Sequence, residues 1–198
     1  MAQAINSVLK GYFNAGDEPT EAQFATLIDS SLNLALTTNQ AATGSVEFTG
    51  GHLNTVVLSG GGTTTLTAAN AGATCVFDTA ATSNFTLPAP DLGMRFDFIQ
   101  VIINTADHVI QAATDGHGFL GGVVMTNTTA DQTDTFSTAT DGSDDFITIN
   151  ATTTGGAAAG SMIHVAAMLG TSAAKTWAVS GTIICSGAGA TPFAASQI

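Results

Sequence analysis

The sequence contains very few basic residues. Only Lys10, Arg95 and Lys175 are basic among 198 residues, against 15 Asp and Glu, so the formal net charge is −12. Proteins that bind nucleic acid need Lys and Arg to neutralise phosphates, and anionic membrane surfaces attract the same side chains. We therefore expect no nucleic-acid partner and no membrane partner.

Long apolar runs and paired cysteines are also missing. No stretch approaches the roughly 20 apolar residues of a membrane-spanning helix, and the N-terminus lacks the basic and apolar regions of a secretory signal. Cys75 and Cys185 stand in apolar surroundings, and neither belongs to a CxxC or Cys/His spacing. We predict two free cysteines that face the core as small hydrophobic side chains.

The motifs of common catalytic sites are absent. No GxSxG sequence accompanies a Ser, His and acid set, and the glycine run at 60–62 lacks the Lys-Ser/Thr ending of a phosphate-binding loop. The four histidines, His52, His108, His117 and His164, have no second His or Cys at ligand spacing. We therefore predict a protein that is not an enzyme, with no catalytic residue and no cofactor.

One acidic stretch, DQTDTFSTATDGSDDF, offers oxygen ligands for a hard cation. Asp141, Asp144 and Asp145 are weak candidates for calcium, because their order does not match an EF-hand loop. The alternative is a solvated turn held by aspartate hydrogen bonds, and we favour that alternative. A polysaccharide-degrading enzyme that uses the same acids is the lowest-ranked function.

The N-terminal part of the chain predicts one amphipathic helix behind an apolar arm. Thr20 precedes Gln23 at capping-box spacing, and apolar residues then recur on one helical face over about 12 to 16 residues. Nothing nearby in the sequence covers the arm, so a partner chain is the expected cover. The candidate partner contacts of this part are Val8, Leu9, Tyr12, Phe13, Phe24, Leu27 and Ile28.

The rest of the chain alternates short strand-like runs with clusters of Gly, Asn, Asp and Thr. This rhythm predicts a mainly β protein, with a β-sandwich or barrel-like body over 45–198 preceded by the arm and helix over 1–44. No internal repeat of fixed period is visible, which excludes solenoids and propellers. The predicted strands are SVEFTG, LNTVVLS, TTTLTA, TCVFDT, NFTLPA, MRFDFIQVIIN, HVIQAAT, GGVVMTN, DTFSTA, DFITINA, SMIHVAAML and TWAVSGTIICS.

The stretch FTLPAPDLGMRFDFIQV contains the densest apolar sequence. Pro88 and Pro90 cannot donate backbone hydrogen bonds, so we predict that one strand ends at FTL and that Gly93 leads into the next. Met94, Phe96 and Phe98 share one face of that next strand, which predicts a core element.

The same strand raises two further points. After Ile99 the apolar parity changes to Val101 and Ile103, which predicts either a bulge or a segment covered on both faces. Arg95 and Asp97 share the other face, where they pair with each other or Arg95 meets an acid on another subunit. We therefore add Arg95 to the candidate partner contacts.

The order TTTLTAANAGATCVFDTAATSNFTLPAPDLGMRFDFIQVIINTADHVIQAA resembles a module of virion surface proteins in tailed bacteriophages, chiefly capsid decoration (cement) proteins and some tail-fibre proteins. YFNAGDEPTEAQFATLIDSSL, DDFITINATTTGGAAAGSMIHVAAML and KTWAVSGTIICSGAGATPF also resemble pieces of such proteins. The resemblance implies a β-rich body, assembly into a homo-oligomer, most often a trimer, and attachment to the phage particle. It implies no catalytic residue.

Two functions follow from this resemblance as expectations. The first is a decoration protein that binds the major capsid protein on the outer surface of the phage head, after synthesis in the bacterial cytoplasm. The second is a tail-fibre or receptor-binding module, whose loops around DGHG and TDGSDD contact a host glycan or protein. The short chain without a repeat-built shaft favours the first.

Overall fold

The structure is a computed structural model that describes residues 11, 16, 18–30, 55–114, 116–169 and 175–195, apart from the side chains of 26–30, 169 and 175. The chain divides into two units, 1–52 and 53–198, and each is described by itself. The predicted domain boundary between positions 44 and 45 lies outside the described residues. The predicted strand SVEFTG lies there too.

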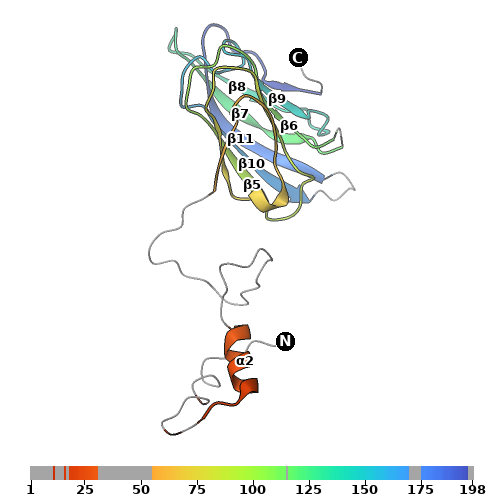
Figure 1. Cartoon of the computed structure of the whole chain (residues 1–198). Helices are drawn as coiled ribbons and strands as arrows, with labels where there is room; N and C mark the ends of the chain where they lie inside the picture. Colours follow the sequence, from red (N-terminus) through yellow and green to blue (C-terminus); the bar gives the residue numbers. More distant parts are fainter. Residues whose placement is uncertain are drawn as a thin grey trace. The chain divides into compact units, whose positions relative to one another are not determined.

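The described part of the N-terminal unit contains α2 (Glu21–Ser30), the helix shown in Figure 1. The backbone N–H of Thr20 donates to Oε1 of Gln23 at 2.7 Å, and the N–H of Gln23 donates to the hydroxyl of Thr20 at 3.4 Å. This is the predicted capping box, which satisfies N–H groups that the first helical turn leaves unpaired. The described helix has 10 residues, and the positions after Ser30 to which the prediction extends lie outside the described residues.

The second unit is a body of twelve short strands (Figure 1). Every strand-like run predicted from Leu53 onward contains a strand, and only the last strand was not predicted. The strands are β1 (Val56–Leu58), β2 (Gly62–Thr65), β3 (Thr74–Phe77), β4 (Ser83–Thr86), β5 (Arg95–Gln100), β6 (His108–Gln111), β7 (Phe119–Asn127), β8 (Thr133–Ser137), β9 (Phe146–Ile149), β10 (Met162–Leu169), β11 (Lys175–Cys185) and β12 (Phe193–Ala194), with one 3₁₀ turn, η1 (Ala68–Asn70).

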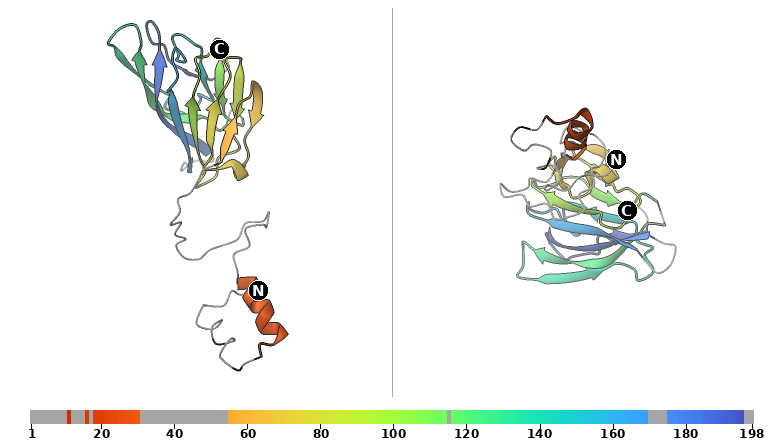
Figure 2. Two further views of the ribbon diagram at one scale, coloured as in Figure 1. Left: turned by 60° about the vertical axis from the view of Figure 1, so that its left-hand side comes forward. Right: turned by 90° about the horizontal axis from the view of Figure 1, so that it is seen from below.

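The strands form two mixed sheets that face each other (Figure 2). The seven-stranded sheet has the order β1-β3-β5-β10-β11-β7-β8, and the five-stranded sheet has the order β12-β9-β6-β4-β2. The first six strands alternate between the sheets, so β1, β3 and β5 are parallel neighbours, as are β2, β4 and β6. The connection between two parallel neighbours therefore contains a strand of the opposite sheet, whereas α/β proteins use a helix for such a connection.

The core lies between the two sheets and is rich in phenylalanine. The rings of Phe77 and Phe85, from opposite sheets, meet edge to face at 5.1 Å, and Phe85 lies 5.5 Å from Phe98. Phe96 packs against Trp177 at 5.8 Å. The prediction of a mainly β, sandwich-like body is confirmed, and burial of these rings is the main source of its stability.

The stretch around the two prolines behaves as predicted in its first half. β4 ends at Thr86 before Pro88 and Pro90, and Gly93 has a φ of +90°, which favours glycine, just before β5 begins. Phe96 and Phe98 are buried, and Met94 packs against the core.

The prediction for the second half of that stretch is wrong. β5 ends at Gln100, and Val101 and Ile103 are exposed, so the segment has neither a bulge nor cover on both faces. The amide nitrogen of Gln100 donates to the carbonyl oxygens of Ile102 and Gly156 and to Oδ1 of Asn104. This buried network folds the chain out of the sheet, which a parity argument based on apolar residues does not anticipate.

Candidate functional site

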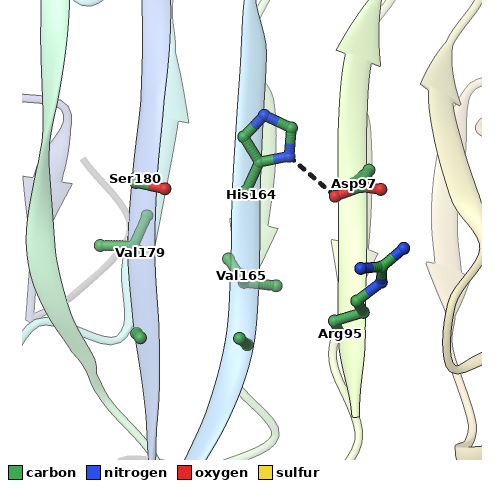
Figure 3. A pocket seen from close by; sticks show the side chains of 8 residues that line it. Arg95, Asp97, His164, Val165, Val179 and Ser180 are labelled. Atoms are coloured by element: carbon green, nitrogen blue, oxygen red, sulfur yellow. Dashed lines mark hydrogen bonds and ion pairs between the residues drawn. The ribbon is translucent and has the colours of Figure 1, made fainter. Parts of the chain in front are cut away.

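The outward-facing side of the seven-stranded sheet, here called the outer face, carries a shallow hollow of about 350 Å³. Figure 3 shows that its lining comes from three adjacent strands, β5, β10 and β11. Ala166, Ala178 and Ser180 have small side chains, so they leave the surface low between larger neighbours. Arg95, Asp97 and His164 line the hollow as well.

Strand alternation explains why these side chains gather. In β5 the even-numbered residues Phe96 and Phe98 fill the core, so Arg95 and Asp97 point outward. In β10 the core takes Ile163 and Val165, which leaves His164 outside. The cross-strand register then aligns Asp97 with His164, and His164 with Ser180.

A hydrogen bond spans the hollow between β5 and β10. Nδ1 of His164 lies 2.7 Å from Oδ1 of Asp97 (Figure 3). Because a carboxylate only accepts, Nδ1 carries the proton and Nε2 is the acceptor of the neutral ring. Asp97 therefore pairs with His164, and the structure shows no ion pair between Arg95 and its strand neighbour Asp97.

Arg95 makes no ion pair within the described part of the chain. Its guanidinium is exposed at the hollow and is always charged. The sequence singled out Arg95 but missed His164, Ala166, Ala178 and Ser180. The parity of SMIHVAAML places His164 outside, but only the strand order brings it next to Asp97.

The row Asp97, His164, Ser180 contains the three residue types of a hydrolase triad, so we compared its geometry with that chemistry. No hydrogen bond joins the Ser180 hydroxyl to His164 among the described contacts, although a nucleophile must give its proton to the histidine. β11 is an interior strand, so its N–H groups are held in the sheet and do not form an oxyanion hole. The row therefore does not have the geometry of an acyl-transfer triad.

The acidic candidates for calcium lie in a tight turn at 139–145. Oδ2 of Asp144 accepts from the N–H of Ala139 at 2.6 Å, and Oδ1 of Asp141 accepts from the N–H of Ser143 at 3.0 Å. Hydrogen bonds from Ser143 lower the pKa of Asp141, and Asp145 is buried. Among the described residues, no three His, Cys, Asp or Glu side chains gather in a way that would hold a metal ion.

The candidate partner contacts of the N-terminal unit are only partly visible. Phe24 is 49% exposed on α2. Val8, Leu9, Tyr12 and Phe13, and the side chains of Leu27 and Ile28, lie outside the described residues. Their role in binding a partner stays a prediction.

The two cysteines are free and buried, as predicted. Burial, with a smaller effect of the Asp97 charge, raises the pKa of Cys75 to about 12. Burial also raises the pKa of Cys185. Both shifts disfavour the thiolate, which is the form of cysteine that reacts as a nucleophile.

Taken together, fold and surface define a mainly β, two-sheet protein with a filled core and one open, small-residue face. In the part of the chain that the structure describes, no helix has the length and apolar character needed to cross a membrane. Comparisons with protein-family models, with curated proteins and with solved structures find no match for this chain.

Proposed function

We propose that this protein is a structural virion protein of a tailed bacteriophage, a capsid decoration protein that binds the outer surface of the assembled head and stabilises it. The observation that carries the proposal is the outer face, because it displays exposed apolar side chains and carries almost no net charge. Val124 and Met162 are each 39% exposed there, and Leu58 is 57% exposed. Surfaces of this kind are typical of protein–protein contacts.

The resemblance to decoration proteins supplies the partner. The protein joins identical copies into a homo-oligomer, a trimer by that resemblance, and docks on the major capsid protein. It acts by binding and not by catalysis. A protein that binds only the assembled shell stabilises that state by mass action, and many weak identical contacts add through multivalency.

The copy number in purified phage particles tests this function. Quantitative mass spectrometry should find the protein nearly as abundant as the major capsid protein. A count of only a few copies per particle would contradict a decoration role and favour the tail-fibre alternative, in which exposed turns such as the one containing Asp141 contact the host surface.

The N-terminal arm provides a second test. Deleting Met1 to Ala15 should weaken binding to stripped particles, because the apolar arm is proposed to dock on the capsid, while circular dichroism and thermal melting of the β body remain unchanged. A full-length variant with Asp131→Lys, an exposed turn position, is the matched control and should bind normally. If the truncated protein decorates particles as well as the full chain does, the arm is not the attachment segment.

A further inference from the structure

The outer face carries an apolar row that crosses six strands of the seven-stranded sheet. Cross-strand partners continue from β1 through β3, β5, β10 and β11 to β7, so side chains far apart in sequence lie side by side. The members of this row are Leu58, Val76, Ile99, Met162, Thr182 and Val124. Leu58, Met162 and Val124 are exposed and Val76 and Ile99 are partly exposed, and packing within the described β body does not cover them.

Charge distinguishes the outer face from the rest of the chain. Among the strand residues whose outward side chains the structure describes, the face has one cation, Arg95, and one anion, Asp97. Its formal charge is therefore zero with His164 neutral, whereas the whole chain carries −12. Identical chains with such a charge repel each other over most of their surface, and the outer face is where that repulsion is absent.

The register of β5 and β10 is symmetric about one row of residues. Phe96 is the cross-strand partner of Val165. A two-fold axis that crosses the strands at this row exchanges positions equally distant from it along each strand. In β5 it therefore places Arg95 of one copy opposite Asp97 of the other. In β10 it places His164 of one copy opposite Ala166 of the other. It also places Met162 opposite Met168.

We propose that the outer face binds the outer face of a second copy of this chain through this two-fold contact. Each Arg95 meets Asp97 of the other copy, so two charge pairs form per contact and satisfy a guanidinium that has no acidic partner among the described residues of its own chain. Each His164 ring lies over the small Ala166 that lowers the surface in the other copy. Met162 and Met168, 39% and 36% exposed, pack on each other and adapt to irregular gaps.

The size of the contact follows from where the axis crosses the sheet. Only β5, β10, β11 and β7 have strand residues on both sides of this row, so these four strands face their copies. At about 4.8 Å between strands and about 20 Å of length they give roughly 400 Å² of sheet surface per copy. A standard stable interface buries about 800 Å² of accessible surface per partner, so this contact belongs to the smaller class of interfaces. Twisted sheets that pack face to face cross at about 30°. The Arg95 side chain is long enough to reach Asp97 of the other copy at that angle.

The contact does not depend on the proposed function, because purified protein alone tests it. A two-fold contact gives an even-numbered assembly: a dimer, or a hexamer if the trimer that the resemblance implies forms elsewhere on the chain. Light scattering after size exclusion and analytical ultracentrifugation of the full chain should show this mass. A monomer, including one whose outer face is covered by its own N-terminal segment, or an assembly that is only trimeric would overturn the proposal.

Charge reversal provides the decisive experiment. Arg95→Asp places two acids opposite each other twice per contact, and Asp97→Arg places two cations opposite each other twice, so each variant alone should associate about tenfold more weakly or worse. Mixing the two variants restores both attractive pairs in the mixed assembly. We therefore expect the mixture to recover the wild-type mass, as native mass spectrometry of isotopically distinguished chains would show.

Two controls separate this contact from general effects. Asp131→Arg makes the same change of charge at an exposed turn and should leave the assembly intact. Asp97→Asn removes the partner of His164 without adding a cation and should weaken association less than Asp97→Arg. The proposal is wrong if both reversal variants associate like the wild type, or if their mixture does not recover while each remains folded by circular dichroism.

Discussion

The inner and outer faces of the seven-stranded sheet are built from alternate residues of the same strands, yet they differ in almost every physical property. On β5, Phe96 and Phe98 are 0% and 2% exposed, whereas Arg95 between the same neighbouring strands is exposed. The inner face holds the two sheets together. The outer face contributes little to folding, which leaves its composition free to serve contacts with other molecules.

The largest difference between the faces should appear on replacing neighbouring residues of β5. Phe98→Ala removes a ring that packs on Phe77 and Phe85, and we expect a loss of about 3–5 kcal/mol in the free energy of unfolding. Ile99→Ala, on the outer face of the same strand, should cost about 1 kcal/mol. Urea denaturation at low protein concentration measures both. Equal losses would mean that the faces are not distinct.

Two glycines allow a second comparison of the inner and outer sides of the sheet, with a smaller expected loss of stability. Gly155 and Gly160 both have positive φ, +116° and +107°, so alanine is strained at either position. A Cβ at Gly155 would overlap Cγ2 of the buried Ile183, whereas at Gly160 it would lie 3.5 Å from Cδ1 of Ile184 in ordinary contact. We expect Gly155→Ala to cost about 1–3 kcal/mol more than Gly160→Ala in thermal and urea unfolding. A larger loss at Gly160 would contradict the assignment of Ile183 to the inner side and Ile184 to the outer side.

A buried histidine should make the core between the two sheets sensitive to pH. The ring of His108 on β6 stacks on Phe77 at 4.6 Å, its Nε2 donates to the carbonyl oxygen of Thr79, and its buried Nδ1 has no partner. Burial lowers the pKa of His108 below its ordinary value of 6.5. Because the folded state favours the neutral ring, this stability is present above pH 6.5 and decreases as pH falls below it.

Thermal melting between pH 7.5 and 5 tests this effect. His108→Gln cannot take up a proton, so its melting temperature should fall less steeply with acidification than that of the wild type. The carboxylates titrate in both proteins, and the difference between the two slopes therefore isolates His108. Identical slopes would show that this ring does not couple folding to pH.

The sequence predicts the local structure of this protein well for a simple reason. Alternation along SMIHVAAML and TWAVSGTIICS identifies which residues face the core, because side chains of a strand point to opposite sides. The capping box at Thr20 and the strand end before Pro88 are likewise local effects of hydrogen bonding. The error after Ile99 arose because the chain leaves the sheet through a network that includes Gly156, which is distant in sequence.

The candidate site was less predictable than the fold. Arg95 and Asp97 were identified on one strand face, but their pairing depends on β10, whose His164 is 67 positions away from Asp97. The strand order that puts β10 beside β5 follows from the packing of both sheets around one core. No local pattern in either strand contains that information.

The sequence by itself determined the composition of the two faces: the inward residues are rich in phenylalanine, the outward residues mix small, apolar and polar side chains, and the chain has almost no cations. These follow from period-two alternation and from composition. Only the tertiary structure decided which strands are neighbours, and so which outward side chains form one surface. The hollow, the His164–Asp97 pair and the position of Arg95 beside them exist because long-range packing sets the strand order and register.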